Sequence, residues 1–256
     1  MIGHIIRKEI KAFEEKENVK VIFVVEAGSR ACGLESKNSD YDVRFVYVRN
    51  RKSYLRLNKS RDTYELVHTD ELDIVGWDLK KFLQLMFKSN PSVYEWLQSN
   101  VIYYEHPKFT YIRMAAKDYY NNKSMAYHYY HTFRSHDNRY IETDKKVTEK
   151  RYLHAIKSLL SAQWILIKKE QPPINFMALE ELLPTELIPI VDGIVINKKC
   201  GIANDPCDRI PEIDKWFFEN KDNMEKLISN LESNVKTWDK LNDVFFEIVN
   251  EFNERS

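Results

Sequence analysis

Apolar runs suited to buried strands recur in the first part of the chain. The runs 21–25 and 43–48 are dense in valine and other residues that favour strands. Segments 63–67 and 72–75 are shorter strand candidates, and the turn-forming Asp70 lies between them. The pattern therefore predicts several strands close together in the sequence.

Helical patterns alternate with these strands. Segment 5–15 carries apolar residues at helical spacing on a charged background, which predicts a helix before the first strand. Apolar positions in 79–86 predict another, with Asp78 placed to favour its first turn. Asn90-Pro91 should stop that helix, and 92–97 has the pattern of a further short one.

The second part of the chain has the helical period in almost every segment. Residues 152–167 predict one long helix, which Gln171-Pro172-Pro173 should end. Prolines mark 184–211 as an irregular stretch with short helices. Segment 213–252 predicts two more long amphipathic helices with a break near Ser233-Asn234.

The change of pattern falls near Pro107 and predicts two domains. Residues 1–106 should form a domain with a small mixed sheet flanked by helices. Residues 107–256 should form a mainly helical domain. The expected fold class is α+β.

The composition agrees with a globular protein and indicates the cellular compartment in which it works. The chain has 256 residues, 43% of them hydrophobic, which is enough to bury a core. No segment approaches the 18 or so uninterrupted apolar residues of a membrane span, and the N-terminus lacks a signal-peptide pattern. Three cysteines, an odd number, fit a reducing compartment. We expect a cytoplasmic protein with no membrane partner.

Charge is balanced overall but uneven along the chain. The 39 basic and 39 acidic residues give no net charge, so no general attraction for nucleic acid follows. A run from Arg49 to Arg61 is nevertheless basic and contains no acid. Two interpretations are open for this run: a solvated loop, or a track for the phosphates of RNA or of a nucleotide.

The most informative segment joins the first two long strands. Gly28 and Ser29 follow the run 21–25 and favour a turn and a helix start, whose free backbone N–H groups can hold phosphate. Asp40 and Asp42 then open the next strand. Because residues i and i+2 of a strand point the same way, both carboxylates should lie side by side.

A third carboxylate would complete a site for Mg²⁺, which prefers oxygen ligands. We choose Asp73, since it is an acid between apolar residues where a buried strand would otherwise have none. Asp70 and Glu71 are the alternatives. Close carboxylates repel, and a divalent cation relieves this repulsion.

The order of these features resembles the polymerase-β-type nucleotidyltransferase superfamily. More narrowly, it resembles a bacterial and phage family of predicted nucleotidyltransferases, some of them associated with RNA-repair gene clusters. The resemblance covers most of the first 165 residues. The matching segments are Gly28-Ser29-Arg30-Ala31-x-Gly33, Ser39 to Phe45, Gly76-Trp77-Asp78-Leu79, and Ser89-Asn90-Pro91 followed by Glu95-Trp96-Leu97.

The resemblance implies transfer of a nucleoside monophosphate from an NTP to a hydroxyl, with release of pyrophosphate. Asp40, Asp42 and Asp73 would be the catalytic, metal-binding residues, with two Mg²⁺ ions, or Mn²⁺ in their place. Gly28 and Ser29 would hold the triphosphate. The acceptor would be RNA, either a tRNA or a broken 3′ end. A protein or small-molecule hydroxyl is the alternative acceptor, and a binding module without turnover is the alternative function.

Four basic residues are further candidates for binding the nucleotide. Arg30 could neutralise phosphate or pair with an acid such as Glu35. Arg44 could brace the carboxylates, meet a phosphate or form a structural ion pair. Lys150 and Lys157 occupy a predicted helix that could close over the nucleotide, although both could equally be solvated.

Other signals favour structural roles. His128 and His131 have the spacing of a helical metal pair, with His136 and Asp137 nearby, but packing among the tyrosines or a stacking surface explains them better. Cys200 and Cys207 match no common zinc motif. We expect Cys32 to be buried. We also expect three tryptophan side chains to fill the core: Trp77, Trp96 and Trp164.

Overall fold

The computed structural model describes residues 2–136 and 147–252. Its contacts divide the chain into two compact units. The sheet unit contains the chain as far as Ala31, then Asp40–Tyr120 and the residues from Val235 onward. The helical unit contains Cys32–Ser39 and Asn121–Asn234. These bounds differ from the expected domains 1–106 and 107–256, because two later helices belong to the sheet unit.

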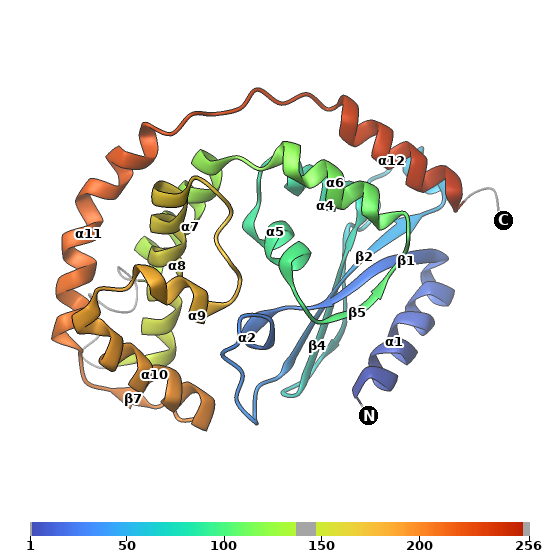
Figure 1. Ribbon diagram of the computed structural model, residues 1–256. Coiled ribbons are helices and arrows are strands. Elements are labelled where there is room, and N and C mark those ends of the chain that lie inside the picture. The colour runs from blue at the N-terminus through green and yellow to red at the C-terminus, as the bar shows by residue number, and fades with distance from the viewer. Residues whose placement is uncertain (1, 137–146, 253–256) are drawn as a thin grey trace. The chain divides into compact units, whose positions relative to one another are not determined.

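The sheet unit is built on a five-stranded mixed sheet of order β3-β4-β2-β1-β5, as Figure 1 shows in part. Only the β2–β4 pair is parallel among the described strands. The mixed sheet that the sequence predicts is thereby confirmed. The strands are β1 (Val19–Glu26), β2 (Tyr41–Arg49), β3 (Thr63–His68), β4 (Leu72–Asp78) and β5 (Ile102–Glu105).

Helices cover both faces of this sheet. On one face α1 inserts Phe13, whose ring lies edge-on to Phe45 at 5.2 Å and to Tyr47 at 5.3 Å. On the other face Phe23 stacks on Phe109 of α6 at 4.2 Å. The helices of this unit are α1 (Ile2–Glu17), α2 (Gly28–Ala31), α3 (Arg51–Tyr54), α4 (Leu79–Phe87), α5 (Pro91–Gln98), α6 (Phe109–Tyr119) and α12 (Asp239–Glu251).

A ring packed on a glycine fixes how β2 and β4 align. Phe45 and Gly76 are partners across the parallel pair. A Cβ placed at Gly76 would lie 2.1 Å from the Phe45 ring, so only glycine leaves room for this ring. Phe45 is fully buried in the core that β2 and β4 share with α1.

A buried acid begins α4. The Asp78 side chain caps the helix by accepting a hydrogen bond from the Lys80 N–H, as expected from the sequence. It also pairs with the Arg49 guanidinium, with Nε and Oδ2 3.3 Å apart. Burial raises the pKa of Asp78 to about 6. Asn90 caps α5 in the same manner, and α4 ends at Phe87, three residues before the predicted stop at Asn90-Pro91.

Lys236 helps to hold the C-terminal segment against the rest of the sheet unit. The Lys236 ammonium donates to the Phe87 carbonyl (3.0 Å), the Ser89 hydroxyl (2.7 Å) and the Tyr119 carbonyl (2.7 Å). Burial lowers the pKa of Lys236. Trp238 stacks on Phe87 with ring centroids 3.7 Å apart. The lysine thus satisfies the free carbonyls at the ends of α4 and α6.

The helical unit is built around α8, which packs against α7. Tyr152 of α8 donates to Asp214 of α11 at 2.9 Å. No helix among residues 2–136 and 147–252 is long and apolar enough to span a membrane. The elements are α7 (Asn122–His136), β6 (Val147–Thr148), α8 (Glu149–Lys168), α9 (Phe176–Leu179), η2 (Glu180–Leu182), η3 (Thr185–Leu187), α10 (Ile188–Cys200), β7 (Pro206–Cys207) and α11 (Pro211–Ser229).

Two helix predictions in this unit need correction. The stretch expected to hold only short helices contains α10, which is 13 residues long. Its Pro189 lies in the first turn, where no backbone N–H is needed, so the proline starts the helix and does not interrupt it. The long helix expected to end at Gln171-Pro172-Pro173 ends at Lys168, because Lys169 adopts a left-handed conformation (φ 60°).

Candidate active site

Two of the predicted carboxylates lie next to each other on neighbouring strands. Asp42 of β2 and Asp73 of β4 are direct partners in the parallel pair. Arg44, two residues further along β2, bonds to both: its Nη2 lies 2.9 Å from Asp42 Oδ1 and its Nη1 lies 2.8 Å from Asp73 Oδ2. These contacts fit two of the roles considered for Arg44, bracing the carboxylates and forming a structural ion pair.

Gly28 makes room for the Asp42 carboxylate. A Cβ at position 28 would lie 1.8 Å from Asp42 Oδ2, and the backbone there has a positive φ of 57°. Both facts favour glycine. The turn is closed from the other side by the Ala27 N–H, which donates to the Asp42 carbonyl at 2.7 Å. The glycine that the sequence marks for phosphate therefore also shapes the acid site.

Asp40 and Arg30 flank this pair. Asp40 directly precedes β2, and its carbonyl accepts a hydrogen bond from Arg30 Nε at 3.1 Å. The Arg30 guanidinium lies 3.8 Å above the Tyr41 ring. Ser29 lies beside Arg30 on α2. The structure thus gathers Gly28, Ser29 and Arg30 around the start of β2, which carries Asp42 and directly follows Asp40.

One acid of the site was not found by the sequence analysis. Glu26, at the end of β1, is 1% exposed and accepts hydrogen bonds from the Asp42 N–H (2.9 Å) and the Tyr103 hydroxyl (2.5 Å). Burial raises the pKa of Glu26, although these two hydrogen bonds oppose the rise. An acid that ends a run of buried apolar residues is the same local conflict that identified Asp73.

The residues present fit a divalent cation. Burial raises the pKa of Asp42, and the charges of Asp40 and Asp73 raise it further while Arg44 opposes them. The three acids thus concentrate more negative charge than one guanidinium offsets, and they offer the oxygen ligands that Mg²⁺ prefers. In the described residues, the ligand atoms of Asp40, Asp42 and Asp73 do not form one tight group. The group of three whose ligand atoms lie within 4.8 Å of one another is Glu65, His68 and Asp73.

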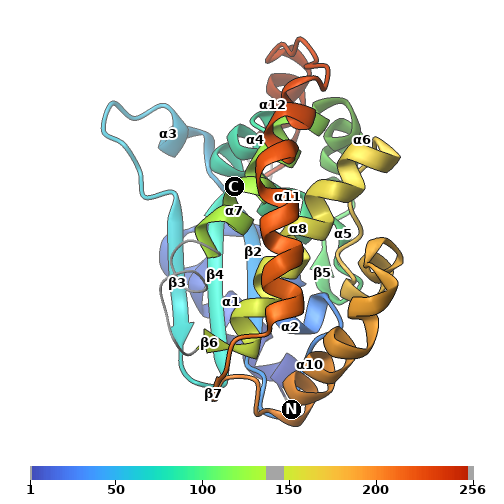
Figure 2. The ribbon, with the colours of Figure 1, turned by 90° about the vertical axis from the view of Figure 1, so that its left-hand side faces the viewer.

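The basic run expected between Arg49 and Arg61 is mostly a surface feature. Arg49 is the exception, since it is 8% exposed and pairs with Asp78. The chain after α3 extends away from the sheet before it enters β3, the edge strand (Figure 2). The exposed bases of the run are Arg51 and Lys52 on α3, and Arg56, Lys59 and Arg61 after it.

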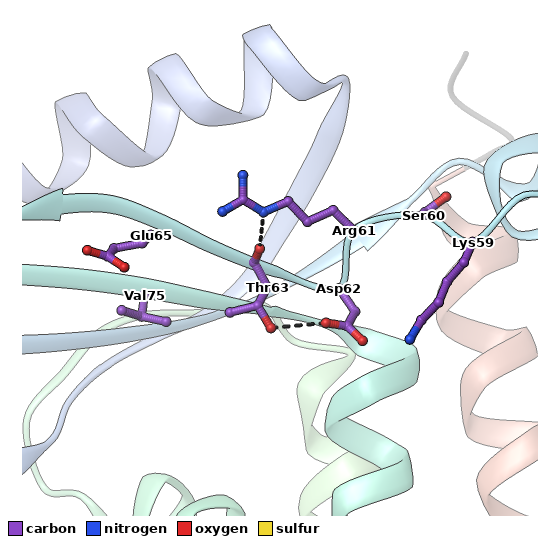
Figure 3. Close-up of a pocket in the computed structure, with 7 residues that line it drawn as sticks. All are labelled: Lys59, Ser60, Arg61, Asp62, Thr63, Glu65 and Val75. Atoms are coloured by element: carbon purple, nitrogen blue, oxygen red, sulfur yellow. Dashed lines mark hydrogen bonds between the residues drawn. The ribbon is translucent and has the colours of Figure 1, made fainter.

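A shallow pocket of about 550 Å³ lies where this loop meets the sheet (Figure 3). Val75, in its lining, is two residues beyond Asp73 and lies on the same face of β4. Arg61 donates to the Thr63 carbonyl at 2.7 Å. The pocket is lined by Lys59, Ser60, Arg61, Asp62, Thr63, Glu65 and Val75.

The remaining candidates lie elsewhere. Lys150 and Lys157 are on α8, in the helical unit and not in the unit that carries the carboxylates. His128 and His131 are exposed and belong to no metal-binding group in residues 2–136 and 147–252, and Asp137 lies outside those residues. The structure therefore leaves the helical metal pair without support.

Two expectations about buried side chains can be checked. Cys32 is buried at 6% exposure, as predicted. Trp96 is buried at 5% exposure, as predicted, and stacks on Trp77 at 4.1 Å. Trp77 and Trp164 are only half-buried, so the core placement expected for all three holds fully for Trp96 alone.

The mixed sheet, the glycine turn and the carboxylates on two adjacent strands agree with a nucleotidyltransferase of the polymerase-β type, and a family match shows that class. The model of the RlaP family, described as "RNA repair pathway DNA polymerase beta family", matches residues 2–247, and the chain belongs to this family. The resemblance seen in the sequence is thereby confirmed.

The similar proteins include one curated relative and one solved structure. The uncharacterized protein YcgL of Bacillus subtilis (strain 168) is 32% identical over 249 residues, which cover 95% of each chain. A crystal structure of a nucleotidyltransferase-like protein from Exiguobacterium sibiricum 255-15 is 12% identical, with a TM-score of 0.34, and covers 98% of this chain and 80% of that one. The enzyme class rests on the family match.

Proposed function

We propose that the protein transfers a nucleoside monophosphate from an NTP to a hydroxyl of RNA, with release of pyrophosphate. The observation that carries the proposal is the alignment of Asp42 and Asp73 on parallel strands, with Arg44 bonded to both. The family description, which places its members in an RNA repair pathway, supports RNA as the acceptor.

In this proposal Asp40, Asp42 and Asp73 hold Mg²⁺, with room for two ions, and Mn²⁺ can substitute. The bound metal supplies charge that activates the attacking hydroxyl and stabilises the leaving pyrophosphate. Glu26 does not bind the metal itself in this proposal. It accepts a hydrogen bond from the Asp42 N–H and so holds in place the strand that carries the Asp42 carboxylate. Arg44 keeps the two carboxylates apart yet aligned.

Gly28, Ser29 and Arg30 hold the triphosphate in this proposal. The Arg30 guanidinium is already ordered by Tyr41 and the Asp40 carbonyl, so little further ordering is needed to meet an anion. Arg44 is a further candidate for a phosphate contact.

The exposed bases after α3 bind the phosphates of the acceptor RNA. Their positions support this, because the pocket they border reaches β4 on the face that carries Asp73. The three cysteines are free thiols, which fits the reducing cytoplasm that the sequence analysis expects.

Incorporation of labelled nucleotides tests the proposal. The protein is incubated with each labelled NTP, Mg²⁺ and total RNA, and the label in RNase-sensitive material is measured. We expect incorporation by the unaltered protein and by Glu15→Gln, an exposed acid on α1 that lies outside the proposed site. Asp42→Asn and added EDTA should abolish it.

The other outcomes separate the alternatives. Activity that survives in Asp42→Asn, or in excess EDTA, would refute the carboxylate mechanism. Label in RNase-resistant material after incubation with cell lysate would show a protein or small-molecule acceptor. Mg²⁺-dependent NTP binding without any product would show a binding module without turnover.

A further inference from the structure

Three metal-binding side chains converge at the outer edge of the sheet. His68 Nδ1 lies 3.3 Å from Asp73 Oδ1 and 3.8 Å from Glu65 Oε1. All three ligand atoms lie within 4.8 Å of one another. His68 and Glu65 are on β3, the edge strand, and Asp73 is on the adjacent β4. This cluster combines one imidazole with two carboxylates.

An irregularity in β3 produces the cluster. Glu65 and His68 are three residues apart, so in a regular strand their side chains would point to opposite faces. The pairing of β3 with β4 shifts between Glu65 and Val67, a bulge that adds one residue to β3. His68 thereby becomes the cross-strand partner of Asp73, on the same face as Glu65.

The spacing matches that of a bound transition metal. In a tetrahedral zinc site, metal–ligand distances of about 2.0–2.2 Å place neighbouring ligand atoms about 3.3–3.6 Å apart. The distances from His68 to Asp73 and to Glu65 lie at and just above this range. The His68 side chain is 74% exposed and that of Glu65 57%, so an ion can reach them without any opening of the fold.

We infer that Glu65, His68 and Asp73 form a binding site for a transition-metal ion of the Zn²⁺ or Co²⁺ type. An imidazole ligand favours such ions over Mg²⁺, which prefers oxygen alone. Three protein ligands leave one position of the tetrahedron open to water. The site lies outside the nucleotide-transfer machinery and shares only Asp73 with it.

The shared aspartate can serve both neighbours at once. Arg44 binds Asp73 through Oδ2, whereas His68 faces Oδ1. An ion held by Oδ1, His68 and Glu65 leaves the ion pair with Arg44 in place. Binding of this metal therefore does not require the carboxylates of the transfer site to rearrange.

Titration of the full-length protein with Zn²⁺ tests the inference, with Mg²⁺ in excess and no NTP or RNA. We expect His68→Ala to lose one equivalent of bound Zn²⁺ and Glu65→Gln to bind at least about tenfold more weakly. His4→Ala and Glu71→Gln, an exposed histidine and an exposed acid outside the cluster, are the matched controls and should bind like the unaltered protein. Unchanged circular dichroism should show that all variants fold.

Co²⁺ provides a second readout, since its absorption distinguishes thiolate from nitrogen and oxygen ligands. The inference predicts a spectrum without a thiolate charge-transfer band, which His68→Ala removes. It is overturned if His68→Ala binds Zn²⁺ with unchanged affinity and stoichiometry, or if the unaltered protein binds none. It is also overturned if binding disappears when Cys200 and Cys207 are replaced by serine. Nucleotide transfer is not measured, so its failure would be a separate result.

Discussion

Replacing Gly28 by alanine would test how closely the site depends on its glycine turn. The added Cβ would lie 1.8 Å from Asp42 Oδ2 and 2.7 Å from the Asp42 carboxyl carbon. Contacts under about 3 Å are not tolerated between such atoms, so the Asp42 carboxylate must move by an ångström or more. The φ of 57° adds backbone strain for any side chain at this position.

The two effects have different magnitudes. A left-handed backbone conformation costs alanine about 1–2 kcal/mol of folding stability. Displacement of a catalytic group by about 1 Å can cost about 100-fold in rate. Gly28→Ala should therefore lower the rate of nucleotide incorporation by about 100-fold or more, while the protein remains folded. Stability would be measured by thermal unfolding and the rate with labelled NTP.

Gly33→Ala is the matched control for this experiment. Gly33 also has a positive φ, 76°, but the nearest atom to its added Cβ is Asn175 Oδ1 at 3.5 Å, an ordinary contact. Both variants should lose stability through the backbone strain, Gly28→Ala at least as much as Gly33→Ala, and only Gly28→Ala should lose activity. If Gly28→Ala stays within about threefold of Gly33→Ala in rate, the role assigned to the Asp42 carboxylate is wrong.

Three further predictions concern buried charges. The pKa of Asp78 is raised from 3.8 to about 6 in the folded protein, so the folded state binds more protons than the unfolded state in this window and stability falls as pH rises through it. Relative to Asp78→Asn, the unaltered protein should thus lose about 3 kcal/mol of unfolding free energy between pH 3.5 and 7, measured by urea denaturation. Lys236→Met should cost about 1–3 kcal/mol by the same measurement, because it removes the donor to the Phe87 carbonyl and the Ser89 hydroxyl, and leaves the Tyr119 carbonyl with only the bond from that hydroxyl. Arg44→Met should tighten Mn²⁺ binding about tenfold in electron paramagnetic resonance titrations, since the guanidinium no longer competes for Asp42 and Asp73.

Controls and contrary outcomes for these three are straightforward. A constant difference between Asp78→Asn and the unaltered protein across the pH range would show that Asp78 has an ordinary pKa. Lys117→Met, at an exposed position of α6, should leave stability unchanged, and an equal loss there would remove the case for Lys236. Arg56→Met, an exposed arginine after α3, should not alter Mn²⁺ affinity. Weaker Mn²⁺ binding by Arg44→Met would contradict the competition argument.

Strong local patterns were sufficient to predict much of the sheet unit. Buried strands of five or more apolar residues, and helices with capping residues, can be recognised from a few neighbouring residues in the sequence. The choice of Asp73 used the same logic, because an acid inside an apolar run has no reason to be there unless it is used. The structure places Asp73 beside Asp42, although its part in catalysis remains a proposal.

Features that depend on distant partners were not predicted. β5 has four residues, Ile102–Glu105, with alternating exposure, and only its pairing with β1 makes it a strand. Glu26 looked like the end of a strand, and only the fold brings it to the Asp42 N–H and Tyr103. The same holds for α12, whose amphipathic pattern shows an apolar face but does not identify what that face contacts.

Because of the contact between Phe45 and Gly76, the packing of the core also determines whether the acids of this site stay aligned. If β4 slipped by one residue against β2, Phe45 would meet a side chain in place of Gly76, and Asp73 would turn to the opposite face of the sheet. The slip that would turn Asp73 away from Asp42 is therefore one that packing opposes. Selection for a stable core would suffice to keep the two acids aligned, so if Asp73 acts in catalysis as proposed, substitutions at Phe45 or Gly76 should lower activity in the same way as loss of Asp73 itself.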